Sequence, residues 1–390
     1  MVKNALSKSN RPTILALSWR DIRAPKAGGA EVQTHEMLKR IAGKVRVIHF
    51  SPMFEGAKEQ EDIEGVTYLR EGNIFSVIWY AFQYYKKNKD KIDYVIDQCN
   101  THRFFSKFWV KKEKRVFLIY QLTKEIWKIN LPFPLSYIGM VSENFMLKLN
   151  KHDITITESE STKNELIQVG FERDKIHIIP IGLKEEIYNY EGMRQSTKEG
   201  HSLVYVGRYS RYKGMDKCIE SLAQVKKQYP DSKLYVCGKR EEEFVEQIIC
   251  PMCDTLGLKL GNLETEQESD VVLCGFVSEE KKYAIMASAR LLLFPSIREG
   301  WGIIVTEAAY LGTPSVVYDA PGSMEAVDYG RTGYVAKEHS VSAITKQIYY
   351  AFENETVYND KQAQGIAYAG KFCWEKNGNM LYNILFNIDD

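Results

Sequence analysis

The chain has 390 residues, of which 44% are hydrophobic and 26% charged, and this is enough apolar material for two hydrophobic cores. No apolar run approaches the roughly 20 residues that a membrane-spanning helix needs, and the polar stretch from Met1 to Pro12 lacks the apolar centre of a secretory signal. The seven cysteines are an odd number scattered through a long chain, which favours reduced thiols over a disulfide framework. We therefore expect a cytoplasmic globular protein.

The net charge of +1 conceals a difference between the two halves of the chain. Residues 1–184 contain 30 Lys and Arg against 21 Asp and Glu, or +9, and subtraction from the totals of 52 and 51 leaves 22 against 30, or −8. A basic first half and an acidic second half favour a division into two domains. They also predict that the first half meets an acidic partner, either a phosphorylated acceptor or an anionic membrane surface.

The first half alternates short apolar runs with helical patterns. It begins with a predicted strand over 13–19, a loop that contains the pair Gly28-Gly29, and a helix over 30–41. Further strands are predicted over 45–50, 94–97, 116–120, 154–157 and 175–180, and a helix over 161–169. The order strand, glycine turn, helix, strand is typical of a doubly wound α/β domain.

The same alternation restarts after a polar segment, 185–200, which we interpret as a linker. Its predicted strands are 202–207, 233–238, 271–274 and 291–294, and its predicted helices are 215–228, 241–256 and 279–287. We therefore predict a first domain over 1–184 and a second over 201–361. The remaining segment, 362–390, has apolar and aromatic residues at helical spacing.

A glycine-flanked turn in the second half carries two carboxylates. The apolar run 291–294 stops at Pro295, Glu299 lies in the turn before Gly302, and Glu307 lies on the following predicted helix. The N-terminal amides of such a helix attract anions, phosphate above all, so the glutamates are better suited to sugar hydroxyls beside the phosphate. An isolated pair of this kind is more often two solvated glutamates on a surface turn.

The segment 295–314 as a whole resembles the Glu-x7-Glu signature of the retaining, nucleotide-sugar-dependent glycosyltransferases of family 4. These enzymes have the GT-B fold, with two Rossmann-like domains and an interdomain cleft. The resemblance implies that Glu307 binds the ribose hydroxyls and that Glu299 contacts the transferred sugar. It also implies that a backbone segment cradles the sugar and phosphate of the donor. That segment consists of Gly300, Trp301, Gly302, Ile303 and Ile304.

Two cations follow the first predicted strand of the second domain. Arg208 lies in a Gly-Arg pair, and Lys213 lies in a Lys-Gly pair a few residues later. Alone they fit an exposed basic loop, but family 4 members carry the same pattern, and the resemblance implies that both cations bind the donor pyrophosphate. They would stabilise the charge that the nucleoside diphosphate gains as the glycosidic bond breaks. No Asp-x-Asp metal motif lies at a strand end, which agrees with chemistry that needs no metal.

The resemblance implies further donor contacts. Gly28 and Gly29 match the glycine pair at the first strand-to-helix turn of the family's N-terminal domain, which closes over the donor phosphates. A dinucleotide site is the rival interpretation of this turn, but Gly-x-Gly-x-x-Gly is absent. In the second domain the implied donor contacts also include Gly238, Phe276 and Val277.

The acceptor side departs from the family's pattern. Family members commonly have a histidine near the end of an N-terminal strand, close to the transferred sugar. At that place this sequence has Tyr120 and Gln121, whereas His102 follows the preceding strand. These three residues are the acceptor-side candidates, and a lone histidine such as His102 is more often structural.

Two other features remain open. Aromatic residues and lysines are dense from Trp79 to Trp109, with Lys111 and Lys112 just beyond, which fits core packing or a membrane-surface patch with lysines on anionic headgroups. Cys250 and Cys253 could bind zinc with more distant cysteines. A single Cys-x-x-Cys is far below a zinc signature, however, and buried cysteines more often pack as small apolar groups.

The resemblance implies a hexosyltransferase that moves a sugar from a nucleotide diphosphate sugar to an acceptor hydroxyl with retention, without metal or cofactor. The implied acceptor is a sugar, a glycoprotein or a lipid-linked glycan, with peripheral membrane association through the basic first domain and no nucleic-acid partner. A GT-B phosphorylase, a sugar-nucleotide epimerase or a catalytically silent donor-binding subunit are the alternatives. Because the last helix of a GT-B fold crosses back, 362–390 is expected to pack on residues 1–184.

Overall fold

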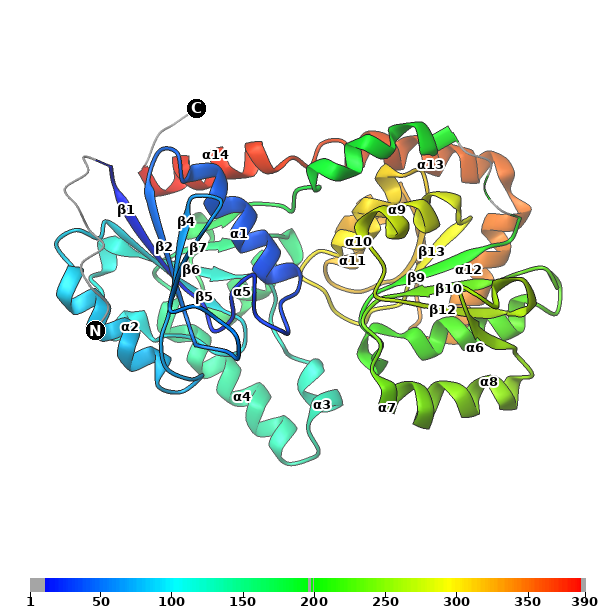
Figure 1. The fold of residues 1–390 in the computed structure, drawn as a ribbon, viewed down its shortest axis with the longest axis horizontal. Coiled ribbons are helices and arrows are strands. Elements are labelled where there is room, and N and C mark those ends of the chain that lie inside the picture. The colour runs from blue at the N-terminus through cyan, green and yellow to red at the C-terminus, as the bar shows by residue number, and fades with distance from the viewer. Residues whose placement is uncertain (1–10, 196–197, 199, 387–390) are drawn as a thin grey trace. The chain divides into compact units, whose positions relative to one another are not determined.

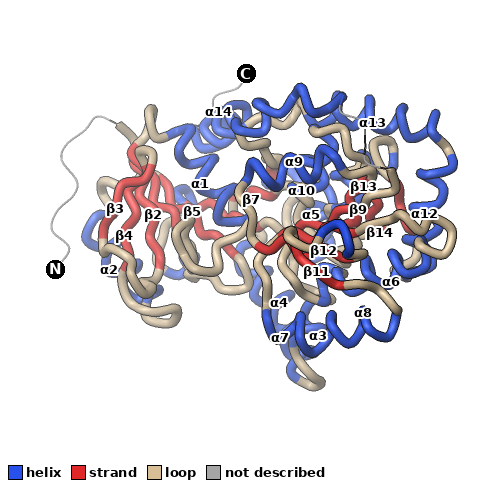
Figure 2. The backbone as a smooth tube through the Cα atoms, turned by 45° about the vertical axis from the view of Figure 1, so that its right-hand side comes forward, coloured by secondary structure: helices blue, strands red, loops and turns tan. Residues whose placement is uncertain are grey.

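The computed structural model describes residues 11–195, 198 and 200–386, and it divides into two α/β units. The first unit comprises Met1–Gly182 together with Cys373–Asp390, and the second comprises Leu183–Phe372. Figure 1 and Figure 2 show that each unit is a sheet with helices on both faces. The predicted fold class, α/β with two doubly wound domains, is confirmed.

The first unit is built on an eight-stranded sheet in the order β3-β4-β2-β1-β5-β6-β7-β8. Its strands are β1 (Thr13–Leu17), β2 (Arg46–Ser51), β3 (Gln60–Ile63), β4 (Val66–Arg70), β5 (Tyr94–Cys99), β6 (Arg115–Ile119), β7 (Ile154–Thr157) and β8 (Ile176–Ile178). Only the edge strand β3 is antiparallel to its neighbour. The central strands are apolar runs buried on both faces, as parallel strands between two helical layers must be.

Helices cover both faces of this sheet. They are α1 (Gly29–Ile41), α2 (Val77–Asn88), α3 (Ile126–Asn130), α4 (Leu135–Leu147), α5 (Glu160–Val169) and α14 (Trp374–Phe386). One face packs with α1 and α14 in a single core. The opposite face packs with α2, and with the last residue of α4 and the middle of α5.

The crossing helix is shorter than the sequence analysis predicts. Trp374 is buried in the first unit's core, and Gly182 has no side chain where a Cβ atom would lie 2.4 Å from the Trp374 ring. By contrast, α13 (Glu355–Ala369) belongs to the second unit, because Gln362 donates a 2.7 Å hydrogen bond to the carbonyl of Gly312 and the Phe372 ring packs on Trp301. The chain therefore crosses at 372–373 and not at 362.

The described part of the segment interpreted as a linker folds as part of the second unit. Residues Glu185–Gln195 form 3₁₀-helical turns in the second unit. They pack there because the Tyr188 ring contacts Tyr310, and because the Arg194 guanidinium donates to the carbonyl of Tyr310.

The second unit is built on a parallel seven-stranded sheet in the order β11-β12-β10-β9-β13-β14-β15. Its strands are β9 (Leu203–Val206), β10 (Leu234–Cys237), β11 (Leu260–Asn262), β12 (Val271–Gly275), β13 (Leu291–Phe294), β14 (Ser315–Tyr318) and β15 (Tyr334–Ala336). Its remaining helices are α6 (Met215–Val225), α7 (Glu242–Phe244), α8 (Cys250–Leu256), α9 (Glu279–Ser288), α10 (Ile303–Tyr310), α11 (Ser323–Ala326) and α12 (Val341–Glu353). A π-helical stretch, Val245–Ile249, joins α7 to α8, so the predicted helix 241–256 is not uniformly α-helical.

A buried histidine on β2 makes the stability of the first unit sensitive to pH. His49 is buried against the Tyr68 ring, whose centroid is 4.7 Å away. Burial lowers the pKa of His49 to about 4; the nearby Asp21 charge opposes this shift, and His35 and Arg70 add to it. The pKa of a histidine in the unfolded chain is about 6.5. Between pH 6.5 and pH 4 the unfolded chain therefore binds a proton at His49 that the folded unit does not bind.

We expect the free energy of unfolding to fall by about 2 to 3 kcal/mol through His49 alone as the pH drops from 6.5 to 4, because the unfolded state gains protons in this window. Above about pH 6.5 His49 is neutral in both the folded and the unfolded state, so none of this loss of stability is present there. Urea unfolding at pH 7 and pH 4.5 measures it, with His49→Gln as the comparison. The variant should lose less stability than the parent over the same interval, and equal losses would contradict the assignment.

Candidate functional site

The residues predicted for donor binding in the second half gather at one edge of the second sheet. The carboxyl ends of parallel strands meet at the same edge, where open α/β sheets bind ligands. In sheet order, Phe276 and Val277 follow β12, Gly238 follows β10, Arg208 and Lys213 follow β9, and Glu299 to Glu307 follow β13. The structure therefore places all of them on adjacent strand-end loops of one unit or, for Ile303, Ile304 and Glu307, on the helix α10 that follows one of these loops.

Glycines without side chains allow these loops to touch. Gly238 has a φ of +147°, and a Cβ atom there would lie 1.9 Å from the carbonyl oxygen of Gly207. A Cβ atom on Gly214, at φ +75°, would lie 2.6 Å from the carbonyl oxygen of Pro295. The loop that carries Arg208 and Lys213 is thus packed, backbone to backbone, against the loops on either side of it.

An ion pair joins the two central loops. The Lys213 ammonium donates to Oε1 of Glu299, and the two side chains are 21% and 12% exposed. Burial lowers the pKa of Lys213, but the negative charge of Glu299 outweighs it and the net shift is upward. Lys213 therefore stays charged, and Glu299 is oriented by a cation that a donor phosphate would also attract.

Arg208 supplies a second positive charge beside this pair. Its side chain is exposed and makes no ion pair within the described part of the chain, while its carbonyl accepts a 2.7 Å hydrogen bond from the Tyr205 hydroxyl. Its charge acts on Lys213, since it opposes the rise in the lysine's pKa. A backbone fixed by Tyr205 and an unpaired guanidinium are suited to an anion that arrives from solution.

The turn after Glu299 ends at the N-terminus of α10. Gly302 adopts a left-handed conformation, with φ +101°, as the N-cap residue directly before the helix. The side chain of Trp301 is buried, and its Nε1 donates a 2.9 Å hydrogen bond to Thr306. The buried Trp301 side chain therefore packs beneath the turn and does not face a ligand. The first-turn amides of Ile303 and Ile304 have no acceptor within the helix and can bind an anion.

Glu307 is held by a lysine that the sequence analysis did not single out. Lys282, on α9, donates to Glu307 at 2.9 Å and to Glu279 at 3.0 Å, and all but 4% of the Glu307 side chain is buried. Burial lowers the pKa of Lys282, but Glu307 and Glu279 outweigh it and raise the pKa overall. Only the Glu279–Lys282 spacing of three residues was visible in the sequence, since the contact with Glu307 requires the fold.

Phe276 presents an aromatic ring to solvent at the same edge. It is 86% exposed, directly after β12, while Val277 is half-buried. A ring exposed to this degree beside charged loops offers a flat apolar surface for a base or a sugar.

In the first unit, the glycine pair opens α1 as predicted. Gly28 precedes the helix, and its amide donates a 2.7 Å hydrogen bond to the buried carboxylate of Glu31. Arg20 lies 3.2 Å from the same carboxylate. The loop before α1 is therefore fixed through Glu31, and Gly29 begins the helix.

The three acceptor-side candidates differ in what they can contact. The Tyr120 hydroxyl is buried and pairs with Thr34 at 2.7 Å, and burial raises the pKa of Tyr120 well above its usual value. Tyr120 is therefore a structural group and not an exposed acceptor contact. His102 is half-buried and stacks on Trp19 with ring centroids 6.2 Å apart.

Three buried polar atoms lie at the carboxyl ends of β1, β5 and β6. They are Nε1 of Trp19, Nδ1 of His102 and Oε1 of Gln121, and none has a hydrogen-bond partner among the residues that the structure describes. Because β1, β5 and β6 are neighbours in the sheet, the three groups lie at the same edge of the sheet, where these strands end. Buried polar atoms without partners are costly, so they are candidates for binding hydroxyl groups. Trp19 was not predicted, and only its position after β1 could have indicated it.

Within the described ranges, no group of three or more His, Cys, Asp or Glu side chains is arranged to hold a metal ion. Cys250 and Cys253 both lie on α8, where Cys253 is buried in the second unit's core. None of the described helices has the length and apolar character needed to cross a bilayer.

Two family models match this chain. Residues 193–371 match the glycosyl transferases group 1, and residues 27–186 match glycosyltransferase family 4. An uncharacterized glycosyltransferase of Methanocaldococcus jannaschii is 23% identical over 378 residues, which cover 93% of this chain and 95% of the relative. With several other curated relatives the match spans about half of their length, 45% to 50%.

Solved structures share the fold at low sequence identity. The sucrose-phosphate synthase of Thermosynechococcus elongatus superimposes with a TM-score of 0.76 at 16% identity, over 97% of this chain and 100% of that one. The HepE protein of Anabaena, solved in complex with UDP and glucose, superimposes with a TM-score of 0.70 at 17% identity, over the same shares of each chain.

Proposed function

Because the chain belongs to glycosyltransferase family 4, with the GT-B fold, we propose that it transfers a hexosyl group from a nucleotide diphosphate sugar to an acceptor hydroxyl. The anomeric configuration is retained, and no metal or cofactor takes part. The observation that carries this proposal is the cluster of Arg208, the Lys213–Glu299 pair and the N-terminus of α10 on adjacent strand-end loops. Each element binds negative charge or sugar hydroxyls.

The donor contacts follow from what each group offers. Arg208, Lys213 and the first amides of α10 bind the pyrophosphate, and Glu307, oriented by Lys282, accepts hydrogen bonds from the ribose hydroxyls. Glu299 accepts hydrogen bonds from the transferred sugar, and Phe276 stacks on the donor. A donor phosphate near Lys213 competes with Glu299 for the lysine ammonium. This competition frees the Glu299 carboxylate to turn toward the transferred sugar.

The transfer step needs no side-chain nucleophile. The acceptor oxygen forms a bond to the anomeric carbon while the bond from that carbon to the leaving phosphate oxygen breaks. The acceptor proton passes to the departing phosphate on the same face. Arg208 and Lys213 stabilise the charge that develops on the nucleoside diphosphate, and this is the role that a metal has in other transferases.

The acceptor binds in the first unit. The unpartnered polar atoms of Trp19, His102 and Gln121 bind its hydroxyls, and stacked rings bind its apolar faces. We propose a sugar, a glycoprotein or a lipid-linked glycan as acceptor. The charge of +9 over residues 1–184, from 30 cations and 21 anions, supports peripheral association of this unit with an anionic membrane.

Substitution of the two glutamates should separate their roles. We expect Glu307→Gln to weaken binding of the bare nucleoside diphosphate about tenfold, the cost of one charge-assisted hydrogen bond. Glu299→Gln should leave that affinity within about threefold and lower the transfer rate. Titration calorimetry with UDP, GDP, ADP and dTDP measures the first effect, and donor turnover measures the second.

Glu353→Gln is the matched control, since this exposed glutamate ends α12 in the same unit and does not follow any of these strands. Nucleotide binding that is lost in Glu299→Gln and kept in Glu307→Gln would reverse the assignment. The alternatives have different products: a phosphorylase requires inorganic phosphate, an epimerase alters the donor without an acceptor, and a silent subunit binds nucleotide and transfers nothing.

A further inference from the structure

The α3–α4 hairpin of the first unit exposes large apolar side chains. Six of them are more than half exposed, although water-facing helices of globular proteins carry polar residues on the outer face. They are Phe133, Leu135, Tyr137, Ile138, Val141 and Phe145. Isolated exposed apolar residues are ordinary, but a cluster of this kind marks an interaction surface.

The hairpin's polar contacts point inward. The Glu143 carboxylate accepts hydrogen bonds from the amides of Thr123 and Lys124, at 2.6 and 3.0 Å, and from Nε1 of Trp127 at 3.1 Å. Gly139 lies under the Trp127 ring, where a Cβ atom would be 2.6 Å away. Thus α3 and α4 are joined to each other by contacts that do not involve the outer apolar side chains.

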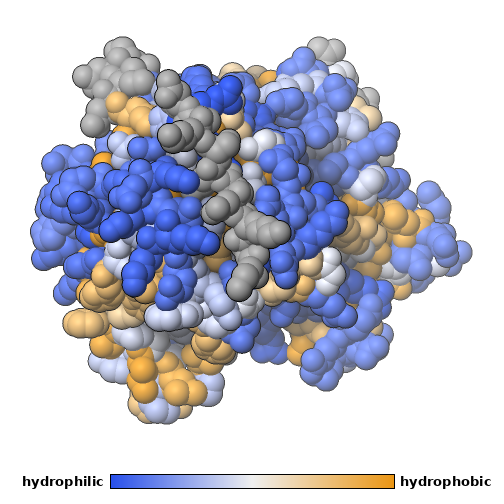
Figure 3. All heavy atoms as spheres, turned by 60° about the vertical axis from the view of Figure 1, so that its left-hand side comes forward, coloured by the Kyte–Doolittle hydropathy of each residue, from blue (hydrophilic) through white to orange (hydrophobic). Residues whose placement is uncertain are grey.

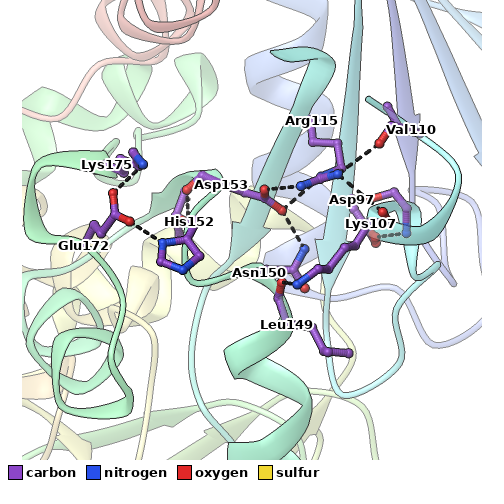
Figure 4. Close-up of polar contacts among 12 residues, drawn as sticks. Asp97, Lys107, Val110, Arg115, Leu149, Asn150, His152, Asp153, Glu172 and Lys175 are labelled. Carbon is purple, nitrogen blue, oxygen red and sulfur yellow. Dashed lines mark hydrogen bonds and ion pairs between the residues drawn. The ribbon is translucent and has the colours of Figure 1, made fainter. Parts of the chain in front are cut away.

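A second exposed aromatic cluster lies on the same face of the sheet. Phe75, Trp79 and Phe108 are 81%, 60% and 70% exposed and line an open groove over α2. The turn that carries Phe108 contacts the segment just after α4, because Lys107 donates a 2.5 Å hydrogen bond to the carbonyl of Leu149 (Figure 4). Figure 3 shows hydrophobic side chains gathered at the lower left of its view.

The positive charge of the first half is concentrated in the same segment. Residues 75–151 contain 14 Lys and Arg against 6 Asp and Glu, or +8, out of +9 for residues 1–184. Lys86, Lys87, Lys111 and Lys112 are exposed next to the aromatic cluster in sequence. Exposed aromatic and aliphatic side chains in a strongly basic segment suit the interface of an anionic bilayer, whereas two copies of this face would repel each other.

We propose that the outer face of α4, together with Phe75, Trp79 and Phe108, inserts into the headgroup region of an anionic lipid bilayer. This surface lies parallel to the membrane plane, at the depth of the headgroups, and does not cross the bilayer. This inference deepens the proposed function, because it names the surface on which a lipid-linked acceptor is met. It can be tested without donor or acceptor, so that its failure is distinct from a failure of transfer.

The test is flotation of the full chain with vesicles of neutral phosphatidylcholine, alone or mixed with anionic phosphatidylglycerol. We expect partition to the anionic vesicles to be at least about tenfold stronger and to fall as salt is added. Ile138→Asp/Phe145→Asp should lower the partition at least about tenfold, and Lys111→Glu/Lys112→Glu should remove the preference for anionic lipid. Thermal unfolding checks that each variant is folded.

Leu256→Asp/Tyr350→Asp and Lys227→Glu/Lys346→Glu are the matched controls, because these residues are exposed in the second unit. Their partition should stay within about threefold of the parent. The proposal is overturned if the parent floats with neither vesicle, or if the hairpin variant floats as well as its control. It is also overturned if sedimentation shows a dimer that the hairpin variant dissociates, since the face would then bind a second copy. A chain that floats but transfers no sugar would contradict the proposed function alone.

Discussion

Arg208→Ala and Lys213→Ala should each lower turnover by about 10²- to 10³-fold at saturating donor, the usual cost of one preorganised group at a developing charge. The reason is that both cations lie on the loop after β9, where the leaving diphosphate gains charge. The effect should fall mainly on kcat, because stabilisation of the leaving group is greatest in the transition state. Lys213→Ala should be the more severe, since it also leaves the Glu299 carboxylate without its cation.

Arg211→Ala is the control for this prediction. Arg211 lies between the two cations on the same loop and is exposed, so its removal changes the loop's charge by the same amount. We expect it to keep turnover within about threefold of the parent, and steady-state rates with a fixed donor and acceptor measure all three variants. If both key variants also stayed within about threefold, the cations would not bind the leaving group.

Trp374→Ala should destabilise the first unit by about 3 to 5 kcal/mol, the range for removing a large buried aromatic side chain. Trp374 is only 3% exposed and belongs to the core shared by α1 and α14. For a unit of this size we expect the melting temperature to fall by roughly 10 °C. Differential scanning calorimetry measures it, with Trp79→Ala as the control, because Trp79 is 60% exposed in the same unit.

Gly182→Ala is a second test of the packing around Trp374. Its Cβ atom would clash with the Trp374 ring at 2.4 Å, so it should also destabilise the unit. In the Trp374→Ala background its cost should fall but not vanish, since the Trp374 backbone nitrogen would still be 2.8 Å away. Strictly additive costs would show that the two residues do not contact each other.

Most strands of both sheets were predictable because parallel strands buried on both faces are continuous apolar runs. The β3–β4 hairpin was not, since β3 is a polar edge strand whose turn is formed by Glu64 and Gly65, both at positive φ. Helix α4 was missed for the opposite reason: it is apolar on its outer side as well, so its sequence has no amphipathic period.

At the candidate site, the sequence indicated residue types but not their pairing. Lys213 and Glu299 were both predicted, 86 residues apart, yet only the fold shows that they form an ion pair. Lys282 could not be predicted, because its role depends on a contact with Glu307 between two helices. Tyr120 was a reasonable candidate by position, but whether a strand-end hydroxyl faces solvent or Thr34 depends on how α1 packs.

The first unit is discontinuous along the chain, and this has a consequence for synthesis. The second unit is one continuous segment, Leu183–Phe372, and all its strands are available once that segment has left the ribosome. The first unit lacks α14 until Cys373–Asp390 have been made, so the apolar surface of α1 that α14 covers stays open during translation of the whole second unit. Although domains generally fold from the N-terminus onward, here the first unit is completed only after the second unit has been made.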